Sequence, residues 1–239
     1  MAKFVVAIDG SAGSGKSTTA KAVAQRLNFL YLDTGAMYRA FTLRYLQSLE
    51  SNTDGIPENI DRSLLKNLLE KTAINLRQEN SETKVYLDGH DVTLEIRTPR
   101  VSGFVSQISA IPQVREWLVK RQRELAENKM VVCEGRDIGS IVFPEAQVKI
   151  YMQADLKVRA QRRQKELSEK KIGDDFKKIF ENLKFRDQYD STRTHSPLKK
   201  TPDAIVVDTT NLTIKQEIDL VEKIILERLK IESQNSNVI

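Results

Sequence analysis

A glycine-rich segment near the N-terminus has the residues and the spacing of a phosphate-binding loop. Its letters, GSAGSGKST, match the pattern G-x-x-x-x-G-K-[ST] at Gly10, Gly15, Lys16 and Ser17. Glycine lets main-chain N–H groups approach phosphate oxygens without a Cβ in the way, and the N-terminus of a following helix adds partial positive charge. Lys16 is expected to reach the β- and γ-phosphates, and the Ser17 hydroxyl to ligate Mg²⁺. The segment therefore predicts a nucleoside triphosphate site formed by Gly10, Ser11, Ala12, Gly13, Ser14, Gly15, Lys16, Ser17 and Thr18.

The residues on either side of this loop distinguish it from an ordinary glycine- and serine-rich turn with a solvated lysine. Phe4 to Ile8 is an apolar run rich in β-branched residues, as expected for a strand buried on both faces of a parallel sheet. After the loop, apolar residues recur at helical spacing, at Ala20, Val23, Ala24 and Leu27. The order strand, loop, helix is the one that phosphate binding requires.

Two large classes of proteins with such loops are disfavoured by what the sequence lacks. A GTPase should carry an N-K-x-D guanine-reading motif, and the Asn128-Lys129 pair has no such aspartate after it. A nucleic-acid motor should have an apolar strand ending in Asp-Glu. In MVVCEG a single carboxylate, Glu134, is followed by glycine. Small-molecule kinases remain, and such an enzyme needs cations around a second phosphate. Arginine occurs with hydrogen-bonding residues in three further segments, 32–40, 133–140 and 184–193.

The rest of the chain alternates strand and helix patterns, which predicts an α/β fold with a mostly parallel sheet. Further strands are expected at 29–32, 130–137, 148–152 and 204–208. Asp33 or Thr34 is expected to cap a helix, and further helices are expected to begin at Thr98-Pro99 and at Pro112. A breaker-rich connection, 53–59, leads into a small α+β insertion at 58–95 with a hairpin turn at Asp88-Gly89. The closing helix is expected at 213–229, with the residues ESQNSNVI after it fraying.

Composition and net charge indicate which ligands and which cellular compartment to expect. The chain has 239 residues, 40% of them hydrophobic, enough for a real core. Thirty-eight Lys and Arg against 33 Asp and Glu give a net charge of +5, which suits polyanionic ligands. The single cysteine, Cys133, cannot form an intrachain disulfide, and neither a signal peptide nor a membrane-spanning run is present. These features predict a cytoplasmic protein without a membrane partner.

The motifs together resemble the bacterial cytidylate kinase family. The segments AIDGSAGSGKST, LDTGAMYR, EIRTPRVS, VREWLVKRQR, EGRDIGSIVFP and RDQYDSTR occur in that order and spacing, and the likeness extends from about Phe4 to Leu229. It implies a P-loop three-layer α/β/α core with a five-stranded parallel sheet, an inserted α+β domain that binds the nucleoside monophosphate, and a short helical lid. The implied ranges are 1–34, 112–154 and 194–239 for the core, 35–111 for the monophosphate-binding domain and 155–193 for the lid.

The resemblance also implies an activity: transfer of the γ-phosphate of ATP, with Mg²⁺, to CMP or dCMP by a monomeric enzyme. The attacking phosphate oxygen is already largely deprotonated, because the second pKa of a phosphate monoester is about 6. The reaction therefore needs cations rather than a general base. By resemblance, Arg39, Arg136 and Arg193 hold the CMP phosphate and act with Lys16 in catalysis, while Arg186 and Asp190 bind the ribose. Asp33, Thr34 and Tyr38 shape the monophosphate pocket, although a core or capping role is an alternative for Asp33.

Base selection has a physical basis in hydrogen-bond polarity. Cytosine presents a donor amine and an acceptor N3, where uracil presents an acceptor and a donor. Asp137 would accept from the amine and Arg115 would donate to N3 or O2, so uracil would face mismatched, desolvated partners. Ser106 is the third base contact by resemblance. Its alternative is an ordinary polar position on a helix.

The predicted lid carries three arginines within about one helical turn, Arg159, Arg162 and Arg163. Their mutual repulsion would be costly unless phosphates arrive between them, although a solvated basic helix face is the alternative. By resemblance, Arg159 and Arg163 approach ATP, and Gly173 is a candidate hinge. The chain departs from the family pattern at Ser11, where proline is frequent, and at Glu134, where aspartate is frequent. The longer Glu134 side chain puts in doubt its contact to Mg²⁺ or its waters.

Two other functions stay open at the level of sequence. The first is another small-molecule P-loop kinase that acts on UMP or on an acceptor that is not a nucleotide. The second is a nucleic-acid-binding P-loop protein, which the basic pI suggests. The sequence lacks the aromatic interleaving that base stacking would need, so no nucleic-acid partner is expected.

Overall fold

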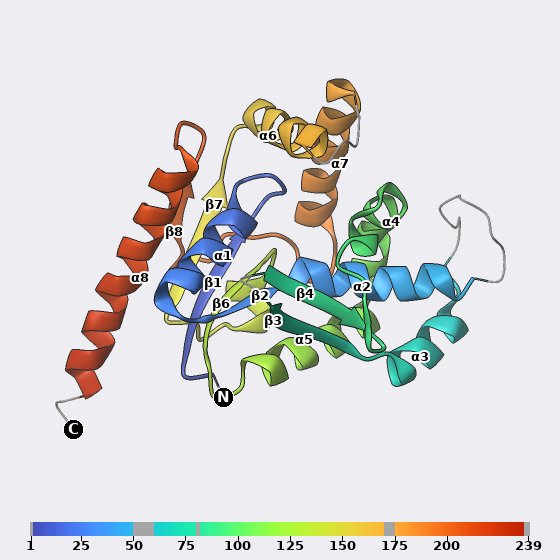
Figure 1. Cartoon of the computed structure of the whole chain (residues 1–239), viewed down its shortest axis with the longest axis horizontal. Helices are drawn as coiled ribbons and strands as arrows, with labels where there is room; N and C mark the ends of the chain where they lie inside the picture. Colours follow the sequence, from blue (N-terminus) through green and yellow to red (C-terminus); the bar gives the residue numbers. More distant parts are fainter. Residues whose placement is uncertain (1, 50–59, 80–81, 170–174, 237–239) are drawn as a thin grey trace. The chain divides into compact units, whose positions relative to one another are not determined.

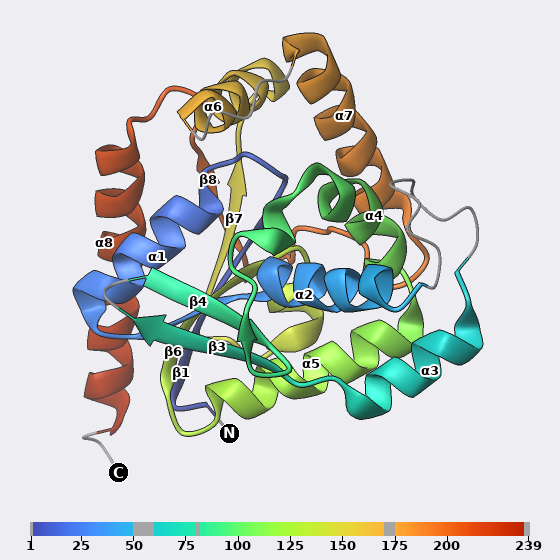
Figure 2. The same cartoon turned by 45° about the vertical axis from the view of Figure 1, so that its right-hand side comes forward.

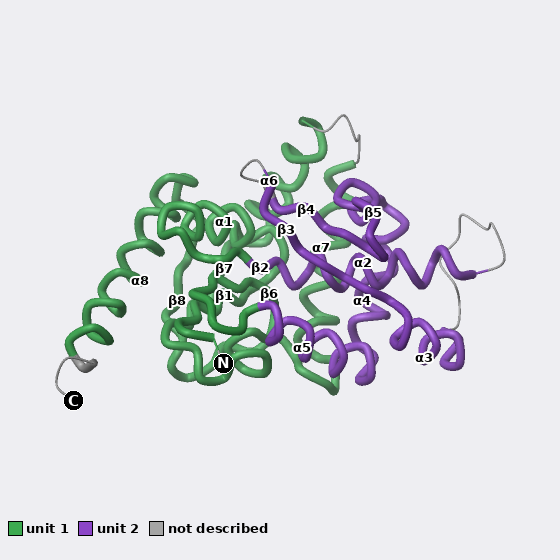
Figure 3. Tube along the Cα trace, turned by 60° about the horizontal axis from the view of Figure 1, so that its bottom comes forward, with its two compact units in different colours: residues 1–31, 126–239 green, residues 32–125 purple. Residues whose placement is uncertain are grey.

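The computed structural model describes residues 2–49, 60–79, 82–169 and 175–236. The predicted connection at 53–59 and the candidate hinge Gly173 lie outside this part of the chain. The described residues form two compact units, one of residues 1–31 and 126–239 and one of residues 32–125, which Figure 3 distinguishes by colour. The segment after Gln153 up to Arg193 belongs to the first unit, and residues 112–125 to the second. The three-part division expected from the sequence stays a prediction.

The first unit contains the predicted five-stranded parallel sheet. Its strand order is β2-β6-β1-β7-β8 (Figure 1). The bounds are β1 Phe4–Gly10, β2 Leu30–Asp33, β6 Met130–Gly135, β7 Val148–Gln153 and β8 Ile205–Asp208. β1 pairs in parallel with β6 on one side and with β7 on the other, and β7 pairs in parallel with β8. The strand that leads into the phosphate loop is therefore the central strand of the sheet.

β1 is buried along its whole length, as its apolar run predicts. Phe4, Val6 and Ile8 point to one face of the sheet and pack in a single core with residues of two helices. These helices are α1, Lys16–Leu27, and α8, Ile214–Ser236, which lie side by side in Figures 1 and 2. α1 contributes Ala20, Val23 and Ala24 to this core, and α8 contributes Ile218, Val221 and Ile225.

The strand register places the ends of three strands together. Asp9 stands opposite Gly135 of β6 and opposite Tyr151 of β7, and Gly10 stands opposite Met152. The loops that follow β1, β6 and β7 therefore leave the sheet at one edge. In parallel α/β sheets this carboxyl edge is where ligands bind.

Two helices follow β7 and belong to the first unit. Both lie within residues 155–193, the range predicted to form a lid. They are α6, Leu156–Glu169, and α7, Phe176–Thr192 (Figure 2). Ala160 of α6 and Ile179 and Leu183 of α7 form a small apolar cluster with Ala12 of the phosphate loop. The loop is thus packed against these helices and not only joined to the sheet.

The described part of the second unit contains four helices and a small sheet. The helices are α2 Thr34–Gln47, α3 Arg62–Lys71, α4 Pro99–Ser109 and α5 Pro112–Ala126, with a short 3₁₀ turn, η1, at Glu95–Arg97. An antiparallel sheet joins β3 Ile74–Glu79, β4 Glu82–Leu87 and β5 His90–Asp91 in that order. α3 and this sheet lie within residues 58–95, the range predicted to form an α+β insertion. Asp88 and Gly89 turn the chain between β4 and β5 with φ values of 50° and 87°, as the hairpin signal predicts.

The helix starts in this unit follow the capping signals. Asp33 is the N-cap of α2 and accepts a hydrogen bond from Ala36 N at 2.9 Å. Thr98 caps α4, with Pro99 in its first turn. Buried aromatic pairs then join the helices, with ring centroids 5.9 Å apart for Tyr45 and Phe104.

The last helix extends further than expected. We expected it to end near Leu229 and the following residues to fray, and that expectation is wrong, because α8 continues to Ser236. Arg228 and Glu232, four residues apart, form an ion pair at 3.2 Å. Ser233 Oγ also donates to the Leu229 carbonyl at 2.9 Å. Such i, i+4 contacts stabilise helix turns that have little apolar packing.

Candidate active site

The phosphate loop ends in an open helix N-terminus. Gly15 takes the N-cap position of α1 with φ of 94°, and no side chain caps the helix there. Ser17 and Thr18 of the first turn are exposed. At the other end of the loop a Cβ on Gly10 would overlap the main-chain carbonyl of Met152, so only glycine fits between β1 and β7. The uncapped amides and the helix dipole form a site for an anion.

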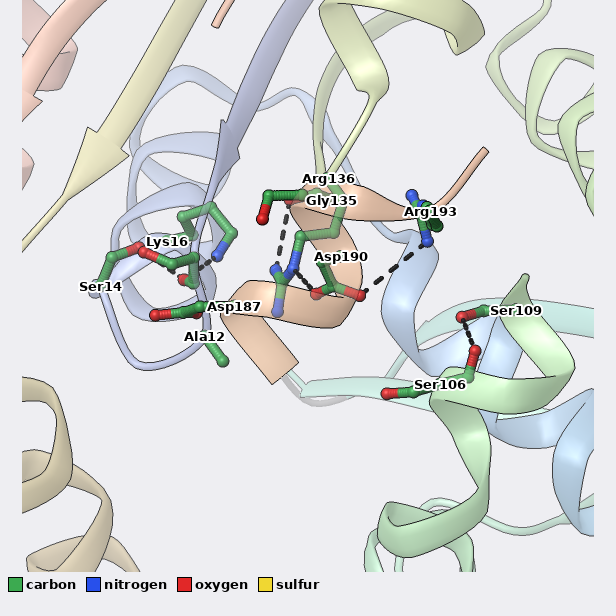
Figure 4. Close-up of polar contacts among 12 residues, drawn as sticks. Ala12, Ser14, Lys16, Ser106, Ser109, Gly135, Arg136, Asp187, Asp190 and Arg193 are labelled. Atoms are coloured by element: carbon green, nitrogen blue, oxygen red, sulfur yellow. Dashed lines mark hydrogen bonds and ion pairs between the residues drawn. The ribbon is translucent and has the colours of Figure 1, made fainter. Parts of the chain in front are cut away.

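Lys16 is almost fully buried, and its ammonium group lies against its own loop. Nζ donates to the Ser11 carbonyl at 2.7 Å (Figure 4). Burial together with the charge of the nearby Arg136 lowers the pKa of Lys16 to about 7, while Glu134 and Asp9 act in the opposite direction. A triphosphate brought to the loop would supply the negative charge that favours the protonated lysine.

Asp9, the residue before the loop, fixes the segment that follows β6. Its two carboxylate oxygens accept hydrogen bonds from Ile138 N and Gly139 N, each at 2.8 Å. These amides lie in the π-helical turn η2, Ile138–Val142, directly after Arg136 and Asp137. Burial raises the pKa of Asp9 to about 6, against the lowering effect of the two amide bonds. Asp9 thus connects the strand of the phosphate loop to the segment of Arg136 and Asp137, two of the residues expected to contact CMP.

A group of arginines lies close to two carboxylates of α7, Asp187 and Asp190. Arg136 Nε donates to Asp190 Oδ2 at 2.8 Å, and Arg193 Nη1 lies 4.0 Å from Asp190 Oδ1 (Figure 4). Arg193 also donates through Nε to the Ser196 carbonyl at 2.7 Å. Burial raises the pKa of Asp190, but Arg136, Arg186 and Arg193 together outweigh it, and the pKa is lowered. Burial together with the charge of Arg136 lowers the pKa of Arg186 to about 10. Positive charge is therefore concentrated here beyond what the carboxylates neutralise.

The three arginines of α6 each have a carboxylate partner. Arg159 Nη2 lies 2.6 Å from Asp187 Oδ2, Arg162 Nη2 lies 3.1 Å from Glu217 Oε1, and Arg163 Nη1 lies 2.7 Å from Glu166 Oε2. The argument that their repulsion requires phosphates is therefore wrong, because α6, α7 and α8 supply the countercharges. Arg159 also donates to the carbonyls of Ala154 and Ala12, at 2.9 Å and 3.1 Å. It thus holds the phosphate loop directly.

In the second unit, three of the expected base-contacting and pocket residues lie together. The guanidinium carbon of Arg115 lies 5.3 Å from the centroid of the Tyr38 ring, and its Nη1 donates to the Ser109 carbonyl at 2.9 Å. Ser109 Oγ in turn donates to the Ser106 carbonyl at 3.0 Å (Figure 4). The side chains of Ser106 and Arg115 are both buried. A cation stacked on an aromatic ring and fixed by main-chain bonds is a preorganised hydrogen-bond donor.

Three further residues expected at the substrate lie at the start of α2 or on its next turn. Asp33 uses its carboxylate as the helix cap described above, so the capping role foreseen as an alternative is present. Thr34 is buried beside it. Arg39 Nη1 donates to Ser102 Oγ at 2.8 Å and to the Ile96 carbonyl at 3.3 Å. The guanidinium of Arg39 is thereby held against α4 and η1.

The residues present fit a magnesium ion that takes its ligands chiefly from a nucleotide and water. Among the described residues, no three His, Cys, Asp or Glu side chains gather closely enough to hold a metal ion. Kinase Mg²⁺ sites commonly use one or two protein oxygens together with substrate phosphates. Ser17, exposed in the first turn of α1, offers such an oxygen. Glu134 is buried in β6 and accepts from Tyr31 Oη at 2.5 Å, so its longer side chain is held in place.

Four residues with marked contacts at the site received no role from the sequence. They are Asp9, Arg162, Asp187 and Glu217. Asp9 lies beside the loop, and its position at the strand end was the one usable signal. The partners of the other three come from separate helices, so no local pattern marks them.

A parallel α/β sheet whose central strand ends in this loop, with cations at the same edge, defines a P-loop nucleotide-binding protein of the kinase type. A sequence model of the cytidylate kinase family matches residues 6–227. The chain therefore belongs to the cytidylate kinase family.

Curated relatives agree with this membership. The chain is 45% identical over 225 residues to the cytidylate kinase of Lactobacillus johnsonii, which covers 94% of this chain and 95% of the relative. It is 45% identical over 223 residues to that of Fusobacterium nucleatum, covering 93% and 97%. It is 47% identical over 222 residues to that of Chloroherpeton thalassium, covering 90% of each. Among solved structures, that of TT1252 from Thermus thermophilus aligns with a TM-score of 0.47 at 17% identity over 96% of this chain and 99% of that one, a likeness on which no argument depends.

Proposed function

We propose that the protein transfers the γ-phosphate of ATP to CMP or dCMP and releases CDP or dCDP and ADP. The observation that carries the proposal is the phosphate loop at the carboxyl edge of the sheet, with Lys16 within electrostatic reach of Arg136 and Arg186. Phosphoryl transfer consists largely of positioning two phosphates and neutralising their charge. Membership of the cytidylate kinase family favours CMP as the acceptor.

In the proposed reaction an oxygen of the CMP phosphate forms a bond to the γ-phosphorus of ATP. The bond between that phosphorus and the β–γ bridging oxygen breaks, and its electron pair leaves with ADP. No proton has to move at neutral pH, because the attacking oxygen is already ionised. Lys16, Arg39, Arg136 and Arg193 supply positive charge where negative charge accumulates. A bound Mg²⁺, held by Ser17, would add to this neutralisation.

Arg136 is the cation best placed to stay oriented during the reaction. Its bond to Asp190 uses Nε and fixes the plane of the guanidinium. We assign the CMP phosphate to Arg136, Arg193 and Arg39, and the ribose to Arg186 and Asp190. In this assignment Asp190 accepts from the ribose and, through its ion pair, also anchors the Arg136 guanidinium.

We assign cytosine to Ser106, Arg115 and Asp137, with Asp33, Thr34 and Tyr38 around the monophosphate. The fixed guanidinium of Arg115 supports the assignment: a guanidinium can only donate, and one held by Ser109 and Tyr38 cannot turn away from the N3–H donor of uracil. Asp137 is buried, so a base that presents an acceptor in place of the cytosine amine would face a desolvated carboxylate.

On the ATP side we assign the loop residues 10–18 together with Arg159 and Arg163. Both arginines already have carboxylate partners. To bind ATP, each would exchange its carboxylate for a phosphate group. Residues 155–193 remain our proposed lid, with 35–111 as the monophosphate-binding part.

The cellular compartment and the oligomeric state of the protein are also proposals. No helix among the described residues is long and apolar enough to cross a membrane. The one cysteine, Cys133, is buried and forms no disulfide, which is in keeping with a reducing compartment. We propose a cytoplasmic, monomeric enzyme that needs no nucleic-acid partner.

A coupled assay that follows ADP formation with ATP and Mg²⁺ tests the function. CMP and dCMP should be turned over much faster than UMP, AMP or GMP. Lys16→Met is the negative control and should abolish ADP formation with every acceptor. Equal turnover of UMP would contradict the assignment of base recognition, and no turnover of any nucleoside monophosphate would contradict the proposed function. Salt-dependent retention on RNA without ADP formation would instead favour nucleic-acid binding.

A further inference from the structure

A buried carboxylate on the last helix lies directly behind the phosphate loop. Glu217, in the first turn of α8, is 1% exposed. Its Oε2 accepts from Thr19 Oγ1 of α1 at 3.2 Å. A Cβ placed on Gly15 would overlap this same oxygen, so the carboxylate is in close contact with the N-cap of α1. Glu217 therefore touches the two sides of the turn on which Lys16, Ser17 and Thr18 lie.

The partner of Glu217 is an arginine with several other fixed contacts. Arg162 Nη2 lies 3.1 Å from Glu217 Oε1. The same guanidinium donates to Thr209 Oγ1 at 3.0 Å, to the Thr209 carbonyl at 2.7 Å and to the Leu212 carbonyl at 3.3 Å. Thr209 is fully buried and its Oγ1 donates to the Ser14 carbonyl at 2.9 Å. The ion pair thus connects to the loop a second time, through Ser14.

One ion pair therefore supports three positions around the nucleotide site. Ser14 is held through Thr209, Gly15 by direct packing of the Glu217 carboxylate, and Thr19 by a hydrogen bond. The amides that would face the triphosphate belong to this same stretch. Because their directions decide how well phosphate oxygens are bound, a small displacement of the turn would weaken ATP binding without touching the ligand.

We propose that Glu217 and Arg162 are positioning residues for the triphosphate of ATP. They act through Ser14, Gly15 and Thr19 and do not contact the nucleotide themselves. The inference rests on the proposed kinase function. It separates Arg162 from its neighbours Arg159 and Arg163, because Arg162 is directed to the back of the loop and to α8.

A purely structural role for the pair predicts something different. The adjoining residues Ile218, Val221 and Ile225 already hold α8 to the sheet. If Glu217 served stability alone, its loss would lower the melting temperature and the active fraction and leave the affinity of the folded protein for ATP unchanged. Positioning predicts a selective loss of ATP affinity.

The test uses Glu217→Gln in the full-length protein. The amide keeps the shape of the side chain and an oxygen for Thr19, but leaves the guanidinium of Arg162, whose side chain is 30% exposed, without its countercharge. We expect the Kd for MgATP, measured by calorimetry without CMP, to rise about tenfold, and the KM for CMP to stay within about twofold. Arg162→Lys should shift the same Kd in the same direction, because a lysine cannot bond Thr209 and Glu217 together.

The matched control is Glu222→Gln on the same helix. Glu222 pairs at 2.6 Å with Arg26, whose side chain is 41% exposed. Surface pairs of this kind contribute little, so both the Kd for MgATP and the KM for CMP should match the wild type. Circular dichroism and thermal melting establish that each variant is folded.

An unchanged Kd for MgATP in folded Glu217→Gln would overturn the inference, as would equal rises in the constants for ATP and CMP. If Glu217→Gln does not fold, the double variant Arg162→Gln/Glu217→Gln, which leaves no unpaired buried charge, replaces it under the same criterion. The proposed function fails separately: the wild type would then bind MgATP but phosphorylate no CMP, and the comparison of Kd values would still decide the role of Glu217.

Discussion

Arg136 and Asp190 join the segment after β6 to helix α7 through a hydrogen bond of 2.8 Å between Nε and Oδ2. The side chains are 19% and 8% exposed, so the pair is only slightly screened by solvent. A guanidinium fixed in this way presents its charge in one direction before any substrate arrives. This preorganisation is what an enzyme needs at a group whose negative charge grows in the transition state.

Replacing Arg136 should therefore affect turnover more than ATP binding. We expect Arg136→Ala to lower kcat by about 10²–10³-fold, because a cation aimed at the transferred group is lost, and to change the Kd for MgATP by no more than a few-fold. Steady-state kinetics at saturating substrates and calorimetry measure the two effects. Arg121→Ala, at an exposed pair with Glu124, is the matched control. An unchanged kcat would remove Arg136 from the catalytic residues.

Asp137 is expected to decide between cytosine and uracil. In Asp137→Ala the ratio of kcat/KM for CMP to that for UMP should shrink by about 10–100-fold, because the acceptor for the cytosine amine is lost and uracil no longer meets a buried carboxylate. Asp203→Ala, at an exposed carboxylate paired with Lys149, should keep the wild-type ratio. If selectivity survives the loss of Asp137, base recognition belongs to other residues.

The lowered pKa of Lys16 predicts that ATP binding takes up a proton. At pH 8 a lysine with a pKa of about 7 is largely neutral in the free protein. The triphosphate favours its charged form, so up to about one proton per site should be taken up on binding. Calorimetry of MgATP binding in buffers with different ionisation enthalpies measures this uptake. The uptake should disappear at pH 6, where Lys16 already carries its proton, and heats independent of the buffer at pH 8 would show that the pKa is not lowered.

The raised pKa of Asp9 predicts a pH dependence of stability. Its pKa is about 6 in the folded protein against an ordinary value of 3.8, so the folded state binds more protons than the unfolded state between these values. The contribution of Asp9 to the free energy of unfolding therefore falls as pH rises from about 4 to about 6, by an amount on the order of 3 kcal/mol. Asn at this position does not titrate. The difference in unfolding free energy between wild type and Asp9→Asn, from urea titrations, should thus become less favourable to the wild type over this window.

Carboxylates with a lowered pKa act in the opposite direction but cancel in the comparison. Asp190, for example, has a lowered pKa, so its contribution grows as pH rises. Because it is present in both proteins, only the Asp9 contribution remains in the difference. A difference that is constant between pH 4 and pH 7 would contradict the raised pKa.

Local sequence patterns were sufficient for the elements that carry the loop. The apolar run Phe4 to Ile8 predicts β1, and the helical spacing after Gly15 predicts α1, both as found. The Asp88-Gly89 turn and the Thr98-Pro99 helix start were equally local, because they depend on backbone torsions and caps within a few residues. The end of α8 was missed, because helical side-chain pairs extend it past its apolar stripe.

The sequence by itself determined that this chain has a strand, a phosphate loop and a helix in succession, and which motifs place it near a known family. Only the tertiary structure decided which charges meet: Asp9 with the amides of Ile138 and Gly139, Arg136 with Asp190, and Arg162 with Glu217. The physical reason is the distance along the chain over which each interaction acts. Torsional preferences and hydrophobic periodicity act over a few residues, whereas burial and ion pairing depend on neighbours that the folded chain brings from far along the sequence.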